Sequence, residues 1–80
     1  MDELRFTPYF ENVVLRRRPY IKKEWYSYVI HNAVRSEPQE GNRYRFWAAV
    51  PELNGRYLRV VTLADMVTVH DALPDRRFRP

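Results

Sequence analysis

Six residues with the chemistry to bind and cleave RNA are spread over three neighbouring hydrophobic segments of the chain. They are Arg43, Arg45 and Trp47 in RYRFWAAV, Tyr57 and Arg59 in RYLRVVTL, and His70 in VTVHDALP. Cleavage of RNA by its own 2′-hydroxyl needs a base, cations beside the charged phosphorane and an acid for the leaving oxygen. Arginine supplies the cation, and histidine exchanges protons near neutral pH. These residue types therefore fit metal-independent cleavage of RNA.

Three of the six residues form the hypothetical catalytic set. His70 would act as base or acid, Arg59 would stabilise the phosphorane, and Tyr57 would donate a proton or stack on a base. Structural roles stay open for the same side chains. A hydrogen-bonded structural role is the more common one for a histidine such as His70, and Arg59 equally fits an ion pair with Glu52 or Asp71.

The other three residues form the hypothetical RNA-binding set. Arg43 and Arg45 would bind phosphate, because the guanidinium group matches its geometry, and Trp47 would stack on a base. The alternatives are a solvated strand face for the two arginines and a cover over the sheet for the indole.

The register of two strands, predicted at Arg43–Val50 and Tyr57–Leu63, decides whether the arginines meet. Side chains alternate between the two faces of a strand. A two-residue turn at Asn54-Gly55 would place Arg59 in the core, where an unpaired guanidinium costs several kcal/mol. A three-residue loop with Gly55 in a left-handed bulge shifts the pairing and turns every side chain over. We therefore predict the bulged register.

The bulged register gathers the candidate residues on one face. Tyr44 and Phe46 then point to the core, as do Leu58 and Val60. The opposite face carries the candidate arginines together with Trp47 and Tyr57, and His70 joins them if the last strand pairs beside its predecessor. The sequence therefore predicts an open, basic sheet face.

The expected elements follow from caps, periodicity and strand-forming residues. They are a helix from Thr7 to Arg18, a helix from about Ile21 to Ala33, and strands at Val34–Glu40, Arg43–Val50, Tyr57–Leu63 and Val67–Ala72. Thr7 precedes a proline at the first helical position, and Pro38 indicates an edge strand. On the second helix, Tyr28 is placed on the buried stripe and Tyr26 on the exposed side. Phe78 is expected to anchor the basic tail.

The elements predict a single α+β domain spanning residues 1–80. Two N-terminal helices would pack on one face of a three- to four-stranded antiparallel sheet and leave the other face open. The net charge of +4 is compatible with a nucleic-acid partner. No apolar run is long enough to span a membrane, and the expected location is the cytoplasm. The absence of cysteine, of a glycine-rich phosphate loop and of histidine–carboxylate ligand spacing argues against a metal or nucleotide cofactor.

Four segments carry a family resemblance: PYIKKEWYSYVIHNAVR, RYRFW, RYLRVVTL and VTVHDALPDRRF. They resemble a set of small uncharacterised bacterial and cyanobacterial proteins that looks related to the RelE/BrnT-like toxin superfamily. The resemblance covers residues from about Phe6 to Phe78. It implies a RelE-like fold, RNA cleavage or inhibition of translation, a possible RNA or ribosome target and a cognate antitoxin. Many relatives have a histidine near the first helix, where this chain has Tyr9 and Phe10.

Three functional hypotheses result. The first is a toxin-antitoxin type RNA-binding protein, with metal-independent endoribonuclease activity. The second is a non-catalytic interaction module that binds a protein through Trp47, Tyr57 and the edge near Pro38. The third is a small homodimer whose arginines pair with Glu52 or Asp75 of its mate. RNA binding would weaken steeply with salt, whereas an apolar protein complex would not.

Overall fold

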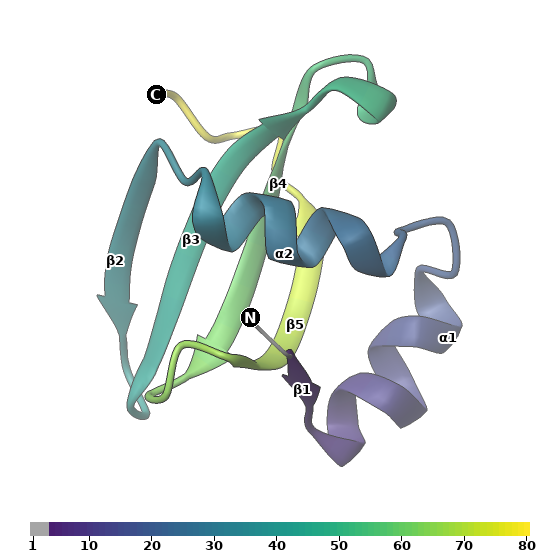
Figure 1. Cartoon of the computed structure of the whole chain (residues 1–80), viewed down its shortest axis with the longest axis vertical. Helices are drawn as coiled ribbons and strands as arrows, with labels where there is room; N and C mark the ends of the chain where they lie inside the picture. The colour runs from purple at the N-terminus through teal and green to yellow at the C-terminus, as the bar shows by residue number, and fades with distance from the viewer. Residues whose placement is uncertain (1–3) are drawn as a thin grey trace.

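The computed structural model describes residues 4–80 and contains one mixed sheet of five strands (Figure 1). The strands are β1 (Arg5–Phe6), β2 (Arg35–Gln39), β3 (Arg43–Val50), β4 (Arg56–Leu63) and β5 (Thr68–Pro74). Their order across the sheet is β1-β5-β4-β3-β2. The pair β1–β5 is parallel and the other three pairs are antiparallel. No helix within residues 4–80 is long and apolar enough to cross a membrane.

Two helical segments lie between β1 and β2. Residues 8–17 are helical and contain a π-helical turn, η1 (Phe10–Val14), followed by α1 (Leu15–Arg17). The second segment is α2 (Lys23–His31), and a short 3₁₀ turn, η2 (Pro51–Leu53), follows β3. Thr7 Oγ1 accepts a hydrogen bond of 3.0 Å from the Phe10 amide, which confirms the predicted cap at this helix start.

The predicted fold, two N-terminal helices on a three- to four-stranded antiparallel sheet, is wrong. A fifth strand, β1, precedes the helices and extends the sheet in the parallel sense beside β5. The Arg5 amide donates to Val67 O at 2.9 Å and the Thr7 amide donates to Val69 O at 3.1 Å. A strand of two residues is too short to show an alternating pattern, so β1 could not be predicted from periodicity.

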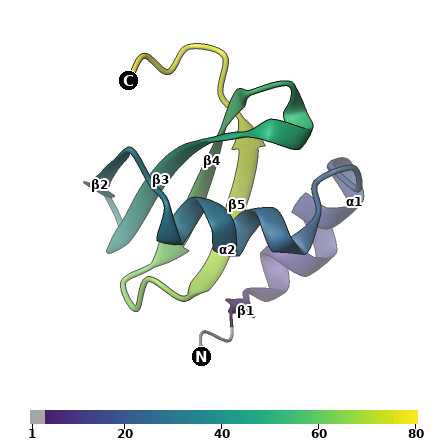
Figure 2. The same ribbon diagram turned by 45° about the horizontal axis from the view of Figure 1, so that its top comes forward.

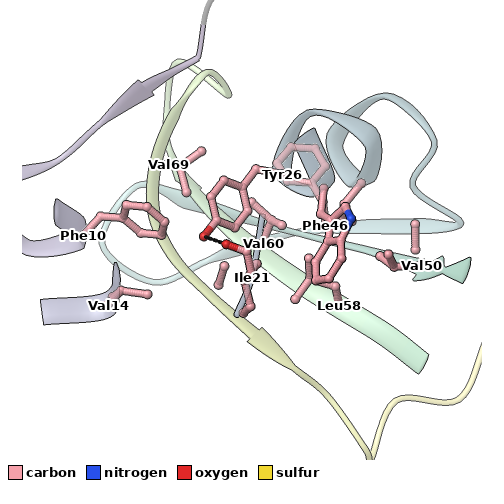
Figure 3. Packing of buried hydrophobic residues seen from close by; sticks show 13 residues of the cluster. Phe10, Val14, Ile21, Tyr26, Phe46, Val50, Leu58, Val60 and Val69 are labelled. Atoms are coloured by element: carbon pink, nitrogen blue, oxygen red, sulfur yellow. Dashed lines mark hydrogen bonds between the residues drawn. The ribbon is translucent and has the colours of Figure 1, made fainter. Parts of the chain in front are cut away.

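The hydrophobic core lies between α2, the first helical segment and the inner face of the sheet (Figures 2 and 3). Tyr26 is 1% exposed and packs edge-on against Phe10, whereas Tyr28 is 44% exposed. The predicted placement of these two tyrosines is therefore reversed. Burial raises the pKa of Tyr26 to about 12, against a smaller opposing effect of the Arg18 charge. The phenol remains protonated and donates to Ile21 O at 3.5 Å.

The predicted assignment of faces in β3 and β4 is confirmed, although the exact residue pairing is not the one that a three-residue loop gives. Trp47 lies opposite Arg59, and Phe46 lies opposite Val60, which is fully buried. The connection is longer than the predicted three residues, because residues 51–55 separate the paired Val50 and Arg56. It forms η2, and then two left-handed residues, Asn54 and Gly55, return the chain to the sheet. A loop of five residues has the same parity as a loop of three, so the same side chains face the core.

A β-bulge in β5 determines where His70 lies. Val61 pairs with Asp71, but the next residue of β4, Thr62, pairs with Val69, which leaves His70 as the extra residue. Val69 is fully buried, while His70 and Asp71 are both partly exposed. The bulge therefore interrupts the alternation and places two consecutive polar side chains on the face away from the core.

Candidate functional site

The outer face of the sheet, opposite α2, carries the six candidate residues. The C-terminal tail, residues 75–80, leaves β5 and passes over one half of this face (Figure 1). Phe78 packs parallel to Trp47, with 4.9 Å between the ring centroids, and lies equally close to Tyr57. Phe78 is 8% exposed and Trp47 is 5% exposed. The prediction that Phe78 anchors the tail is confirmed, but the face is not fully open.

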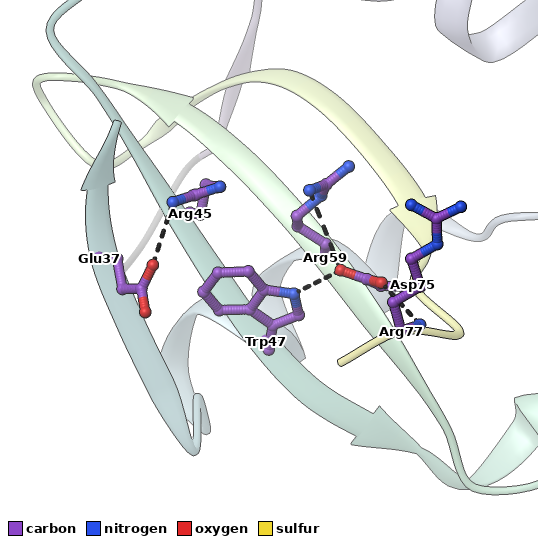
Figure 4. Close-up of polar contacts among 6 residues, drawn as sticks. All are labelled: Glu37, Arg45, Trp47, Arg59, Asp75 and Arg77. Atoms are coloured by element: carbon purple, nitrogen blue, oxygen red, sulfur yellow. Dashed lines mark hydrogen bonds and ion pairs between the residues drawn. The ribbon is translucent and has the colours of Figure 1, made fainter. Parts of the chain in front are cut away.

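Polar contacts fix the tail in place (Figure 4). Trp47 Nε1 donates to Asp75 Oδ2 at 2.9 Å, and Arg59 Nη1 lies 3.9 Å from the same oxygen. The hydrogen bond from Trp47, followed by smaller contributions that include the Arg59 charge, holds the pKa of Asp75 below its usual value against the effect of burial. The Arg35 guanidinium lies 5.0 Å from the Phe78 ring centre. Trp47 is thus a structural residue in this conformation and is covered against stacking on a base.

The other half of the outer face is a polar pocket of about 360 Å³, which we call the His70 pocket. Its lining residues are Tyr9, Gln39, Arg43, Arg59, Val61, His70 and Asp71. They come from β2, β3, β4 and β5 and from the start of the first helical segment. The β5 bulge is what brings the imidazole and the Asp71 carboxylate to this pocket together.

His70 is held by two contacts in this pocket. Its Nδ1 and Thr7 Oγ1 are joined by a hydrogen bond of 3.0 Å, and its ring stacks on Tyr9 with 4.9 Å between centroids. The second ring nitrogen, Nε2, has no hydrogen-bond partner within residues 4–80. Burial, followed by the nearby Arg43 charge, lowers the pKa of His70 below 6.5, while Asp71 opposes the shift. His70 is therefore a neutral imidazole at neutral pH, with one nitrogen available to a ligand.

Arg43 is the cation of this pocket with no acidic partner. Among residues 4–80 its side chain forms no hydrogen bond or ion pair, whereas Arg18 lies 3.7 Å from Asp71 across the pocket rim. The Nε groups of Arg43, Arg45 and Arg59 are all buried and have no hydrogen-bond partner within residues 4–80. Buried donors in native proteins are nearly always satisfied, so these groups call for water or a bound acceptor.

The other two arginines are already paired. Arg45 Nη2 donates to Glu37 Oε1 at 3.0 Å across the β2–β3 pair. Arg59 lies near Asp75, so the predicted alternatives, pairing with Glu52 or with Asp71, are wrong. The tail folds back over the sheet and presents its own carboxylate, which a strand-by-strand reading of the sequence does not reveal.

The structure brings together part of the predicted catalytic and RNA-binding sets. Arg43, Arg59 and His70 line one pocket. Trp47 and Tyr57 lie under the tail, away from that pocket, and Arg45 lies beside Trp47, with its guanidinium 5.4 Å from the indole centre.

Two pocket residues were missed from the sequence. Tyr9 reaches the pocket because β1 ties the start of the first helix to β5, and Gln39 reaches it because β2 ends beside the start of β3. The aromatic residue at the helix start was visible in the sequence, but its position depended on the unpredicted β1 strand. Within residues 4–80 no group of three or more histidine or carboxylate side chains is arranged to hold a metal ion.

Comparisons of the chain with protein-family models, with curated proteins and with solved structures found no match. The resemblance to RelE/BrnT-like toxins therefore stays a prediction, and the site has to be interpreted from its own geometry.

Proposed function

We propose that the protein is an RNA-binding protein of the toxin type that cleaves RNA at the His70 pocket without a metal ion. The observation that carries the proposal is that a neutral imidazole and two arginines line one polar pocket. Arg43 and Arg59 supply positive charge, and His70 supplies a nitrogen that accepts a proton. These are the groups that cleavage by an internal 2′-hydroxyl requires.

The proposed reaction balances with the groups in the pocket. In the tautomer whose Nδ1–H donates to Thr7 Oγ1, His70 Nε2 takes the proton of a ribose 2′-hydroxyl, and the 2′-oxygen attacks the adjacent phosphorus. The bond from phosphorus to the 5′-oxygen breaks, which leaves a 2′,3′-cyclic phosphate and a 5′-hydroxyl. Arg43 and Arg59 stabilise the additional negative charge of the phosphorane. The 5′-oxygen takes a proton from water or from the Tyr9 phenol. Tyr9 would then have the role of proton donor that was predicted for Tyr57.

The proposed pocket also explains why the Arg43 side chain is unpaired. A guanidinium that already has a carboxylate partner must give it up to bind phosphate, as Arg45 would have to leave Glu37 and Arg59 would have to leave the more distant Asp75. Arg43 has no such competitor within residues 4–80, and a phosphate oxygen satisfies its buried Nε group. Arg43 is therefore the residue whose loss tests binding most directly.

The test compares Arg43→Ala with the wild type on single-stranded RNA. We expect Arg43→Ala to weaken RNA binding about tenfold or more, because a hydrogen bond to a charged group contributes about 1.5–3 kcal/mol. Arg16→Ala is the matched control, since it removes the same charge from an exposed position outside the pocket. Binding is measured by fluorescence anisotropy, and cleavage by gel electrophoresis with analysis of the product ends.

A cellular readout follows from the same pair of variants. Induced expression of the wild type is expected to arrest bacterial growth with cut messenger RNA, and Arg43→Ala is expected to relieve the arrest while Arg16→Ala does not. Intact RNA in cells and in vitro, together with equal behaviour of the folded wild type and Arg43→Ala, would rule out the proposal.

A further inference from the structure

A second group of arginines lies beside the tail, and of these only Arg59 takes part in the proposed reaction. This arginine cluster consists of Arg35, Arg45, Arg59, Arg77 and Arg79, which surround Trp47 and Phe78 together with the two carboxylates Glu37 and Asp75. Five arginines against two carboxylates give a local net charge of +3. The His70 pocket holds two arginines, one carboxylate and a neutral imidazole, a local net charge of +1. Arg59 is counted in both sums, and the more positive site is thus the one whose other four arginines have no assigned role.

Three cations of the cluster, Arg35, Arg77 and Arg79, have no acidic partner within residues 4–80. Arg35 lies over the Phe78 ring, and neither Arg35 nor Arg77 forms an ion pair within residues 4–80. The backbone amide of Arg77 donates to Asp75 Oδ1 at 3.1 Å, which fixes the start of its side chain (Figure 4). Phe78 and Asp75 hold the tail against the sheet at this point. Like charges held close together oppose folding, and a bound anion removes that cost.

We propose that the arginine cluster is a second phosphate subsite, which binds the phosphodiester next to the one in the His70 pocket. Arg59 lines both sites, so the two anion positions adjoin each other on one sheet face. Successive phosphodiesters of one RNA strand supply two anions at such neighbouring positions. The preferred ligand is then a strand with at least two phosphodiesters, and the C-terminal tail forms part of the binding surface. This inference rests on the proposed function, because the first phosphate lies in the His70 pocket.

The experiment uses the full chain and two short RNAs that are 2′-O-methylated, so that they bind without being cleaved. One has a single phosphodiester and the other has two. We expect Arg77→Gln and Arg35→Gln each to weaken binding of the longer RNA about tenfold at low salt. The slope of log affinity against log salt should become shallower by about 0.7 for each lost phosphate contact. Affinity for the RNA with one phosphodiester should stay unchanged.

Arg76→Gln is the matched control. Arg76 adjoins Arg77 in the same tail and is also exposed, but it lines a different hollow with Arg56 and Pro74. Removal of its charge should therefore leave the affinity for both RNAs close to that of the wild type. Far-UV circular dichroism checks that each variant is folded, above all Arg35→Gln, because the Arg35 guanidinium lies 5.0 Å from the centre of the buried Phe78 ring.

The outcomes separate this inference from the proposed function. If the longer RNA loses affinity in Arg43→Ala but not in Arg77→Gln or Arg35→Gln, the second subsite is wrong and the His70 pocket stands. An equal loss in Arg76→Gln also overturns the subsite, because the effect is then one of total charge. If the wild type binds neither RNA, the proposed function fails together with the subsite.

Discussion

The two halves of the outer sheet face are built from the same strands and similar residues, yet they have become opposite environments. Over one half the tail lays Phe78 on Trp47 and leaves both rings less than 10% exposed. Over the other half Tyr9 stacks on His70 but stays 45% exposed, and a polar pocket remains. The covered half adds buried apolar area, which stabilises a small domain. The open half lacks this burial and leaves a pocket that a ligand can enter.

Because the chain is small, leaving half of the outer face uncovered lowers its stability appreciably. A chain of 80 residues buries a smaller share of its surface than a larger domain does, so each buried aromatic ring counts. The tail adds a second, smaller hydrophobic cluster on the face opposite the main core, from Trp47, Tyr57 and Phe78. Extension of the tail over the other half would add stability and would close the His70 pocket.

Truncation of one ring in each half gives the largest expected contrast. Phe78→Ala should lower the free energy of unfolding by about 3–5 kcal/mol, because it leaves a cavity over Trp47. Tyr9→Ala removes a ring of similar size from the open half and should cost less than about 1 kcal/mol. Urea denaturation measures both values, and Phe78→Leu provides a milder variant if Phe78→Ala does not fold.

Equal costs for the two truncations would contradict the comparison. Tryptophan fluorescence adds an independent check, since loss of Phe78 should shift the emission of Trp47 to longer wavelength. A Trp25→Phe background removes the signal of the other tryptophan, which lies in the main core. An unchanged emission spectrum in Phe78→Leu and Phe78→Ala would mean that the tail does not shield Trp47.

The second contrast concerns the carboxylate of each half. Asp75 accepts from the buried Trp47 Nε1 group, so Asp75→Ala leaves that donor unsatisfied and should cost about 1–3 kcal/mol. Asp71 lies at the rim of the pocket, 3.7 Å from Arg18, and Asp71→Ala should cost less than about 1 kcal/mol. Urea denaturation at neutral pH measures both.

The dependence of stability on acidic pH gives a second test of the Asp75 carboxylate. The folded-state pKa of this carboxyl is lowered, so its contribution to stability is present above the unfolded value of 3.8 and is lost as the pH falls through the folded pKa. The wild type should thus lose more stability than Asp75→Asn between neutral pH and that acidic range. Parallel acid curves for the two proteins would contradict the role of the charged carboxylate.

Part of this contrast could be predicted from the sequence. The cost of burying Arg59 was enough to choose which side chains of β3 and β4 face the core, because a slip of one residue would have turned every side chain over. The exact pairing was not predicted, since it depends on the length of the connection. Phe78 was recognisable as a tail anchor, since an isolated aromatic residue among charges gains from finding an apolar surface. In both cases the alternative arrangement, a buried Arg59 or an exposed Phe78, has a much higher free energy, and this can be judged from the local sequence.

The rest depended on contacts between segments far apart in the chain. The short strand β1 has no periodic signal, yet it brings Thr7 and Tyr9 to His70. The bulge that places His70 beside Asp71 comes from the pairing of β5 with β4, and no residue pattern within β5 predicts it. The buried face predicted for the second helix was wrong at Tyr26. Phe10 of the first helical segment packs against the Tyr26 ring, so more of the helix surface is buried than packing on the sheet alone would bury.

The smallest expected effect, and the most informative about the open half, is the titration of His70. Burial and Arg43 lower its pKa, so the folded protein binds fewer protons than the unfolded chain just below pH 6.5. Stability should therefore rise with pH through that window and be lost as the pH falls toward the folded pKa. His70→Gln should show a flatter dependence between about pH 7 and about pH 5, measured by urea denaturation.

A bound phosphate should reverse the direction of this shift. An anion beside the imidazole favours its protonated form, so NMR titration should show a higher pKa for His70 with 2′-O-methylated RNA than without it. Arg43→Ala serves as the control: loss of its charge should raise the pKa of the free protein and reduce the response to RNA. A pKa of 6.5 or above in the free wild type, or one that RNA leaves unchanged, would mean that the open half is a solvated surface without a binding role. The two halves would then differ in burial alone.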